Sequence, residues 1–238
     1  MLSVIKSSLI GIVLLIASIQ DVKSREIDDR IWLFAIPIGL LLTIAEALTI
    51  PTYPHVLAII SIIVSIVIAL GFAYFELYGG ADAKAIITIA FTLPIPPDGQ
   101  FLIFPITVFG NALMIVAIFL PFLMILCLIW NLFMIYKGMN LFSGYNISTW
   151  KKILVMLIGV KVKSNIAYSV HFNIMERIGK NGRREIRLLR KIEEEKEKLE
   201  GDYLWASFGL PLIVFIFAGY LIYFLYGDLM FNLLIHFL

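Results

Sequence analysis

Two aspartates, Asp21 and Asp82, each border a long apolar run of the sequence. An acid beside a membrane-spanning segment is a functional candidate, because a buried charge there costs about 3 kcal/mol. Two carboxylates that come close together share one proton. The ionised one can then activate a water molecule, while the protonated one polarises a carbonyl group. The pair therefore predicts hydrolysis of an amide bond with no metal and no other cofactor.

The residues before Asp82 are small: Gly79, Gly80 and Ala81. Glycine lets another chain approach its backbone closely, as an extended peptide substrate would need. A second interpretation stays open on residue chemistry alone. The two glycines could form a tight turn, with Asp82 as an ordinary cap of the next helix, and Asp21 could be one charge among many in a wet loop.

The other acids and the histidines predict less chemistry. Glu46 and Asp98 fall near the opposite membrane face, where solvation suffices, and Glu76 lies about two helical turns before Asp82. The three histidines are scattered, and the chain has neither an HExxH nor a Gly-x-Ser-x-Gly motif. We therefore expect no metal site and no serine nucleophile.

The elements that must position the two aspartates are apolar helices. Of 238 residues, 61% are hydrophobic and only 15% are charged, which is typical of an integral membrane protein. The net charge of +2 gives no reason to expect a nucleic-acid partner, and the one cysteine excludes an internal disulfide. The sequence predicts an all-α fold with six membrane-spanning helices, at about 3–20, 31–50, 56–78, 83–97, 108–136 and 203–226.

The predicted domain organisation follows the charges. Residues 1–136 carry spans one to five, residues 137–202 form a soluble insertion, and residues 203–238 carry span six and the C-terminal tail. Fourteen of the nineteen lysines and arginines fall between Lys137 and Lys198. By the positive-inside rule, the insertion and both aspartates then face the cytosol, and Lys6 is the one exception. Within the insertion, Ile186, Leu189 and Ile192 recur at helical spacing, which predicts a solvated amphipathic helix from Arg183 onward; a basic helix face on anionic lipid is the alternative.

Three short motifs carry a resemblance to a known family. Gly79-Gly80-Ala81-Asp82 resembles the G-x-G-D motif of the GxGD aspartyl proteases, with alanine in the third position. The segment from Asp21 to Asp29 is similar to the first-aspartate segment of the type IV prepilin and archaeal preflagellin peptidases. Gly209, Leu210 and Pro211 look like the proline-containing motif found near the aspartate pair in this group. The absence of a cysteine-rich region before span one makes the chain most similar to the archaeal preflagellin peptidases.

The resemblance implies a multi-pass enzyme of the cell membrane. It implies that Asp21 and Asp82 are catalytic, and that Gly79, Gly80, Ala81, Gly209, Leu210 and Pro211 contact the substrate. The substrate would be a preflagellin or prepilin precursor, from which a short basic leader is removed at the cytosolic boundary; membrane lipid is the other expected partner. Two alternatives remain: a transporter or channel that uses the intramembrane acids, and a structural subunit of the filament machinery.

Overall fold

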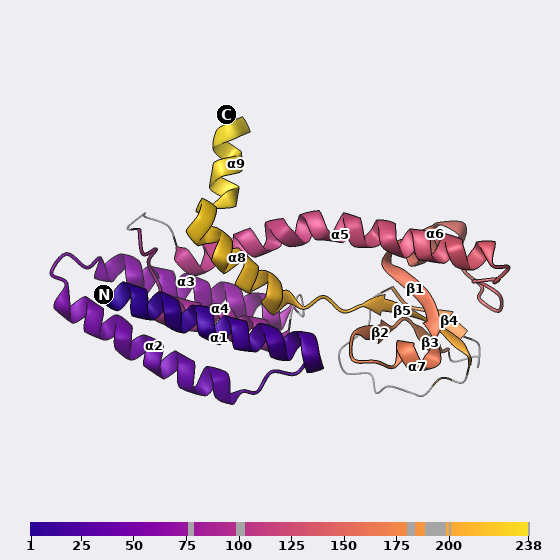
Figure 1. The fold of residues 1–238 in the computed structure, drawn as a ribbon, viewed down its shortest axis with the longest axis horizontal. Helices are drawn as coiled ribbons and strands as arrows, with labels where there is room; N and C mark the ends of the chain where they lie inside the picture. Colours follow the sequence, from indigo (N-terminus) through magenta and orange to yellow (C-terminus); the bar gives the residue numbers. More distant parts are fainter. Residues whose placement is uncertain (76–78, 99–102, 180–183, 189–198, 200, 238) are drawn as a thin grey trace. The chain divides into compact units, whose positions relative to one another are not determined.

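The computed structural model describes residues 1–75, 79–98, 103–179, 184–188, 199 and 201–237. The chain divides into two compact units. The helical unit comprises Met1–Ala117 and Pro211–Leu238, and the sheet unit comprises Ile118–Leu210. Figure 1 follows the chain through both units.

Long apolar helices build the helical unit. Those of the described residues are α1 (Leu2–Ser24), α2 (Arg30–Thr49), α3 (His55–Tyr74), α4 (Gly80–Thr92), α5 (Phe104–Tyr136), α8 (Leu212–Tyr226) and α9 (Leu229–Phe237). In the described part of the chain, α1, α2, α3 and α5 are long and apolar enough to cross a membrane, while α8 is apolar but shorter. The chain is therefore a multi-pass membrane protein, as its composition predicts.

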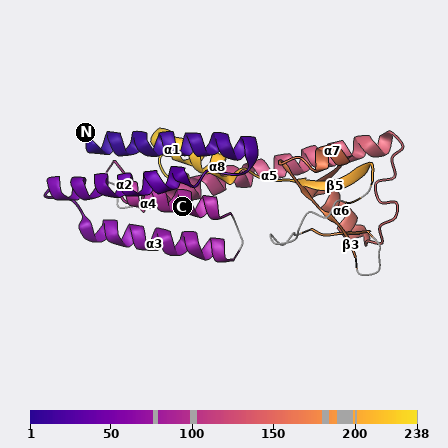
Figure 2. The same cartoon turned by 90° about the horizontal axis from the view of Figure 1, so that it is seen from below.

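Helix α4 is the central element of this unit, packed against both α2 and α3, while α1 packs against α2 and α8 (Figures 1 and 2). Gly39 lets α2 approach α4, since a Cβ at this position would collide with the side chain of Thr92. One turn further along α2, the Thr43 hydroxyl donates a hydrogen bond to the Thr92 carbonyl oxygen at 2.8 Å. These contacts fix the position of the helix that begins beside Asp82.

Helix α4 ends earlier than the predicted span at 83–97. It stops at Thr92, because prolines follow at 94, 96 and 97 and a residue before proline avoids the helical conformation. The chain beyond it is held by side chains of other helices: the hydroxyl of Ser61 on α3 donates to the carbonyl oxygen of Pro94 at 2.5 Å. At 13 residues, α4 is about 20 Å long, shorter than a hydrocarbon core of about 30 Å.

The sheet unit contains α6 (Thr149–Ile158), β1 (Gly159–Lys163), α7 (Ser164–Ala167), β2 (Phe172–Ile174), β3 (Glu176–Ile178), β4 (Arg184–Ile186) and β5 (Tyr203–Phe208). Strand β5 lies between β1 and β2 and pairs antiparallel with both, with Lys161 opposite Trp205. Strands β3 and β4 form a separate antiparallel pair. The second half of α5 belongs to this unit and packs on the sheet, where Cys127 joins Val160, Leu204 and Ala206 in one apolar cluster.

Three expectations were wrong here. The fold is mostly helical but not all-α, because the sheet unit contains strands. The run from Tyr203 to Phe208 is a strand and not the start of span six; it is apolar because it is the central strand of its sheet, and the helix starts only at Leu212. Arg184–Ile186, which were expected in a helix, pair with β3 instead. The rest of that expected helix, 189–198, lies outside the described residues.

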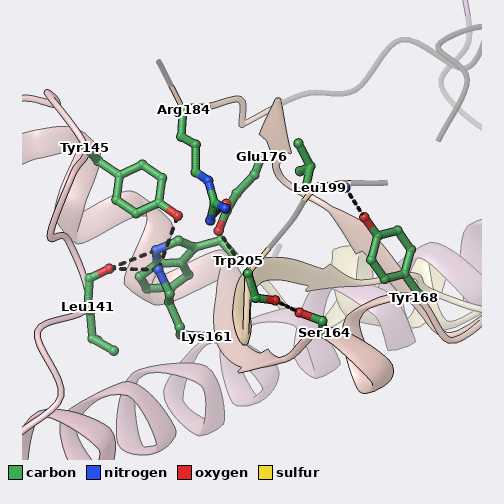
Figure 3. A network of polar contacts seen from close by, with 10 residues as sticks. Leu141, Tyr145, Lys161, Ser164, Tyr168, Glu176, Arg184, Leu199 and Trp205 are labelled. Carbon is green, nitrogen blue, oxygen red and sulfur yellow. Dashed lines mark hydrogen bonds and ion pairs between the residues drawn. The ribbon is translucent and has the colours of Figure 1, made fainter. Parts of the chain in front are cut away.

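A buried polar network ties the sheet unit together (Figure 3). The ammonium group of Lys161 donates to the Leu141 carbonyl oxygen at 3.3 Å and to the Tyr145 hydroxyl at 3.2 Å. Trp205 donates its indole N–H to the same Leu141 oxygen at 3.2 Å, and Glu176 accepts from the Trp205 backbone N–H at 2.6 Å. Burial lowers the pKa of Lys161, against the opposing charge of Glu176. The network therefore pins the loop that follows α5 onto the sheet.

Candidate active site

Asp21 lies in the last turn of α1 and is almost fully buried. Its carboxylate is 3.8 Å from the guanidinium group of Arg25, one turn further along the helix. The backbone N–H of Ile213 lies within hydrogen-bonding reach of the same carboxylate. Ser18, three residues earlier on α1, donates its hydroxyl to the Ile213 carbonyl oxygen at 3.4 Å. The Ser18 hydrogen bond therefore ties the start of α8 to α1 beside Asp21.

The start of α8 suits this contact. Pro211 is the residue before α8, and Ile213 is in the first helical turn, whose N–H groups have no partner within the helix. The N-terminal end of a helix also carries a partial positive charge, which favours a carboxylate. This part of the proline-containing motif is thereby brought to Asp21.

Asp82 lies in the first turn of α4 and is half-buried. It accepts a hydrogen bond from the Gly79 backbone N–H at 2.9 Å. The N-cap of α4 is Gly79, and Asp82 is the N3 residue of its capping box, so Asp82 supports the helix start without being the cap residue of the alternative interpretation. A capping role does not exclude a catalytic one, because a carboxylate has several lone pairs and this contact uses one oxygen.

The fold brings the two aspartates together although 61 residues separate them in the sequence. Helix α1 packs on α4, and the charges of both Asp21 and Arg25 are close enough to act on Asp82. Among the described residues, no hydrogen bond joins the two carboxyl groups. The pair therefore lies within electrostatic range across the α1–α4 contact.

The glycines beside Asp82 differ in what surrounds them. A Cβ built on Gly80 would meet no atom within 4 Å, so the space beside it is open. A Cβ on Gly79 would lie 3.3 Å from the Asp82 carboxylate. Both glycines are exposed and Ala81 is half-buried. An extended peptide could therefore approach the backbone next to Asp82.

The remaining motif residues belong to the end of the sheet. Gly209 donates its backbone N–H to the His171 carbonyl oxygen at 3.0 Å, which extends the pairing of β2 with β5. Leu210 is the last residue of the sheet unit, and Pro211 is the first residue of the returning helical unit. Of the three predicted residues, Pro211 is the one that adjoins a contact of Asp21.

The other described acids in the helical bundle have structural partners. Glu46 is paired with Lys6 at 2.5 Å; Lys6 is buried and Glu46 is half-buried. Asp98 accepts the hydroxyl of Tyr223 with both oxygens at 2.9 Å. Glu76 lies outside the described residues. Since Glu46 and Asp98 are held by α1 and α8, the described acids do not form a continuous path through the bundle, as a transporter would need.

A cavity of about 440 Å³ lies at the Lys6 end of the bundle, lined by Glu46, Tyr53, Leu93 and Pro96 among others. Lys6 precedes Asp21 by fifteen residues on α1, or about 22 Å along the helix. This cavity therefore does not belong to the aspartate pair.

Sequence reasoning missed several contacts of the site. Lys84 and Asp29 form an ion pair at 2.6 Å that joins the start of α4 to the start of α2. The Arg25 contact could have been expected from its i, i+4 spacing to Asp21. The pairs 29–84 and 21–213 could not, because their members are far apart in the sequence and meet only through helix packing.

Two acids at the ends of neighbouring helices of a membrane protein are the arrangement expected for a peptidase of the aspartic type. Comparison with known sequences agrees with this class. The profile of the type IV leader peptidase family matches residues 8–130, and that of the archaeal peptidase A24 C-terminus, type II, matches residues 151–229. The chain belongs to the type IV leader peptidase family.

Three curated relatives are each named preflagellin peptidase. The protein of Methanococcus maripaludis is 30% identical, over 94% of this chain and 96% of the relative. That of Methanococcus voltae is 30% identical, over 90% of this chain and 92% of the relative. That of Methanocaldococcus jannaschii is 32% identical, over 90% of this chain and 91% of the relative. The likeness covers both units, so the sheet unit is part of what these proteins share.

Proposed function

We propose that this protein removes the leader peptide from preflagellin, or from a related prepilin precursor, with Asp21 and Asp82 as the catalytic pair. The relatives' shared name supports the substrate class. The observation that carries the assignment of residues is the pairing across the α1–α4 contact, while Glu46 and Asp98 are occupied elsewhere.

The proposed chemistry needs one shared proton. The ionised carboxylate takes a proton from water as the water oxygen forms a bond to the scissile carbonyl carbon. The protonated carboxyl group donates a hydrogen bond to the carbonyl oxygen, which gains negative charge. When the C–N bond breaks, the proton passes to the departing amine nitrogen. The open space beside Gly80 gives the extended substrate room to lie along the backbone before Asp82.

The proposed site faces the cytosol. The end of the bundle that carries the two aspartates also carries four basic residues: Lys23, Arg25, Arg30 and Lys84. Most of the other basic residues lie in residues 137–202, the proposed cytosolic insertion, so the positive-inside rule places both on the cytosolic side. Lys6 is at the opposite end, but its charge is buried and paired with Glu46, so it does not weigh against this orientation. With α4 and α8 counted as spans, six helices cross the membrane.

The test is cleavage of purified preflagellin by the full-length protein in detergent. Asp21→Asn and Asp82→Asn should each lower the cleavage rate by at least about a thousandfold, and the double variant should be no slower than either single one, because the pair acts as a unit. Asp98→Asn is the matched control and should cleave within a few-fold of the parent rate. Substantial cleavage by a well-folded Asp82→Asn protein would refute the residue assignment. Ion flux into vesicles without any cleavage would favour the transporter.

A further inference from the structure

Helix α6 exposes an apolar stripe on the side away from its own unit. Trp150, Ile153, Leu154 and Leu157 follow the i, i+3, i+4, i+7 spacing of one helix face. Trp150 is 76% exposed, and Ile153 and Leu154 are 45% and 42% exposed. Val155, on the other side of the helix, is 1% exposed and packs with Met134, Leu141, Met175 and Trp205. The helix therefore uses one face for its own core and leaves a second apolar face largely exposed, with Leu157 at its end half-buried.

The position of α6 along α5 is fixed by a side chain. Asn131 donates its amide N–H₂ to the carbonyl oxygens of Met156 at 3.0 Å and Gly159 at 2.7 Å, both at the end of α6. Asn131 also accepts from the Lys161 backbone N–H at 3.3 Å. It lies five residues before the end of α5, or about 8 Å along the helix. The end of α6 is thus fastened to the last turns of a membrane-crossing helix.

The surface of α5 around this point is itself apolar and exposed. Ile129, Leu132, Phe133 and Ile135 are among its exposed side chains, and Tyr136, 88% exposed, ends the helix before Lys137. Apolar residues that end in a tyrosine and a lysine are typical of a helix leaving the hydrocarbon for the lipid headgroups. The stripe of α6 is thus fastened beside an exposed apolar surface of α5 that ends in Tyr136 and Lys137.

The charge around α6 fits anionic headgroups. No aspartate or glutamate occurs between Asp98 and Glu176, whereas lysines occur at 137, 151, 152, 161 and 163. Lys151 and Lys163 are exposed, Lys152 lies 5.7 Å from the Phe142 ring centre, and Lys161 is buried in the network of Figure 3. A tryptophan with exposed aliphatic residues, flanked by lysines without acids, is the composition of a helix that lies in an anionic membrane surface.

We propose that α6 is an interfacial anchor: its face of Trp150, Ile153, Leu154 and Leu157 inserts among the headgroups on the side where α5 ends, and the exposed Lys151 contacts anionic lipid. The network of Lys161, Tyr145 and Leu141 holds the loop that leads into α6, so the helix is presented in a fixed orientation. The anchor would hold the sheet unit against the bilayer surface.

The test is spin-label depth measurement on the full chain with Cys127→Ser, reconstituted in nanodiscs of phosphatidylcholine with or without phosphatidylglycerol. A label at Ile153→Cys should collide with oxygen more often, and with an aqueous nickel chelate less often, than a label at Ser143→Cys, an exposed loop position of the same unit. Lys151→Glu should lower the protected fraction about fivefold in discs with phosphatidylglycerol, and much less without it.

Equal exposure to the nickel chelate at positions 153 and 143 in both kinds of disc would overturn the proposal. Protection at 153 that persists in detergent micelles but depends on added preflagellin would also overturn it, because the face would then bind protein. Asn131→Ala provides a second test, because it removes the hydrogen bonds that fasten α6 to α5. In this variant α6 should keep its lipid contact only in discs with phosphatidylglycerol. Loss of the secondary structure in any variant is monitored by circular dichroism.

Discussion

Asp82 accepts the backbone N–H of Gly79 at 2.9 Å, so the acid proposed for catalysis also supports the start of the helix on which it stands. The two roles can be separated by substitution. Asparagine can still accept the Gly79 hydrogen bond but cannot share a proton, whereas alanine loses both functions.

Asp82→Asn should therefore abolish cleavage and leave the thermal unfolding temperature in detergent nearly unchanged. Asp82→Ala should abolish cleavage and also destabilise the protein by about 1 kcal/mol, the usual value of a helix cap. Differential scanning fluorimetry beside the cleavage assay distinguishes the two. A large loss of stability in the asparagine variant would mean that the charge of Asp82, rather than its cap, supports the fold.

The pair of the buried Lys6 and the half-buried Glu46 predicts that single variants lose more stability than the double variant. Glu46→Gln leaves the buried ammonium group without its charged partner and should cost about 3 kcal/mol or more. Lys6→Met with Glu46→Leu removes both charges and should recover most of that loss. Both measurements use thermal unfolding in detergent. A double variant as unstable as the single one would show that the pair has a net stabilising role.

Gly39 predicts a packing defect at a distance from the aspartates. Gly39→Ala places a methyl group against Thr92 and should cost about 1–3 kcal/mol, because α2 and α4 must move apart. Gly71→Ala is the matched control, since a Cβ there meets no atom within 4 Å. Cleavage should fall in the first variant alone, together with its unfolding temperature. Equal unfolding temperatures for the two variants would contradict the close approach.

The ion pair of Lys84 and Asp29 should matter little, although it lies beside the site. Asp29 is largely exposed and Lys84 is 42% exposed, and ion pairs open to solvent contribute no more than about 1 kcal/mol. Lys84→Met and Asp29→Asn should each change cleavage by less than about fivefold, with non-additive effects in the double variant. A loss as large as that of Asp82→Asn would instead mean that Lys84 contacts the substrate or the reacting groups.

Much of this architecture could be predicted from the sequence, because the apolar runs that form the long helices are long enough to be recognised. Runs of about twenty apolar residues have few structural alternatives, so α1, α2, α3 and α5 were found close to their limits. The strand β5 was mistaken for part of a span, because a central strand is as apolar as a membrane helix over six residues. Arg184–Ile186 fit a helical spacing as well as a strand, and the contact with Glu176–Ile178 decided between them.

The candidate site was also predictable only in part. Asp21 and Asp82 could be singled out because an acid at the end of an apolar run is conspicuous. The Ile213 contact could not, since it involves a backbone N–H that any residue would supply. The partner of Lys6 could not be predicted either. Glu46 was expected to be solvated at the membrane face, and the local sequence does not indicate the α1–α2 packing that brings it to Lys6.

The strand order β1-β5-β2 has a consequence for how the protein is made. The central strand is the last of the five described strands to leave the ribosome, since it begins at Tyr203, while β1 ends at Lys163. Chains emerge at about 5–20 residues per second, so β1 and β2 must wait for some seconds with their edges unpaired. During that interval neither strand has its neighbour, and α8 follows β5 after only three residues. Closure of the sheet and insertion of α8 are therefore nearly simultaneous events in synthesis.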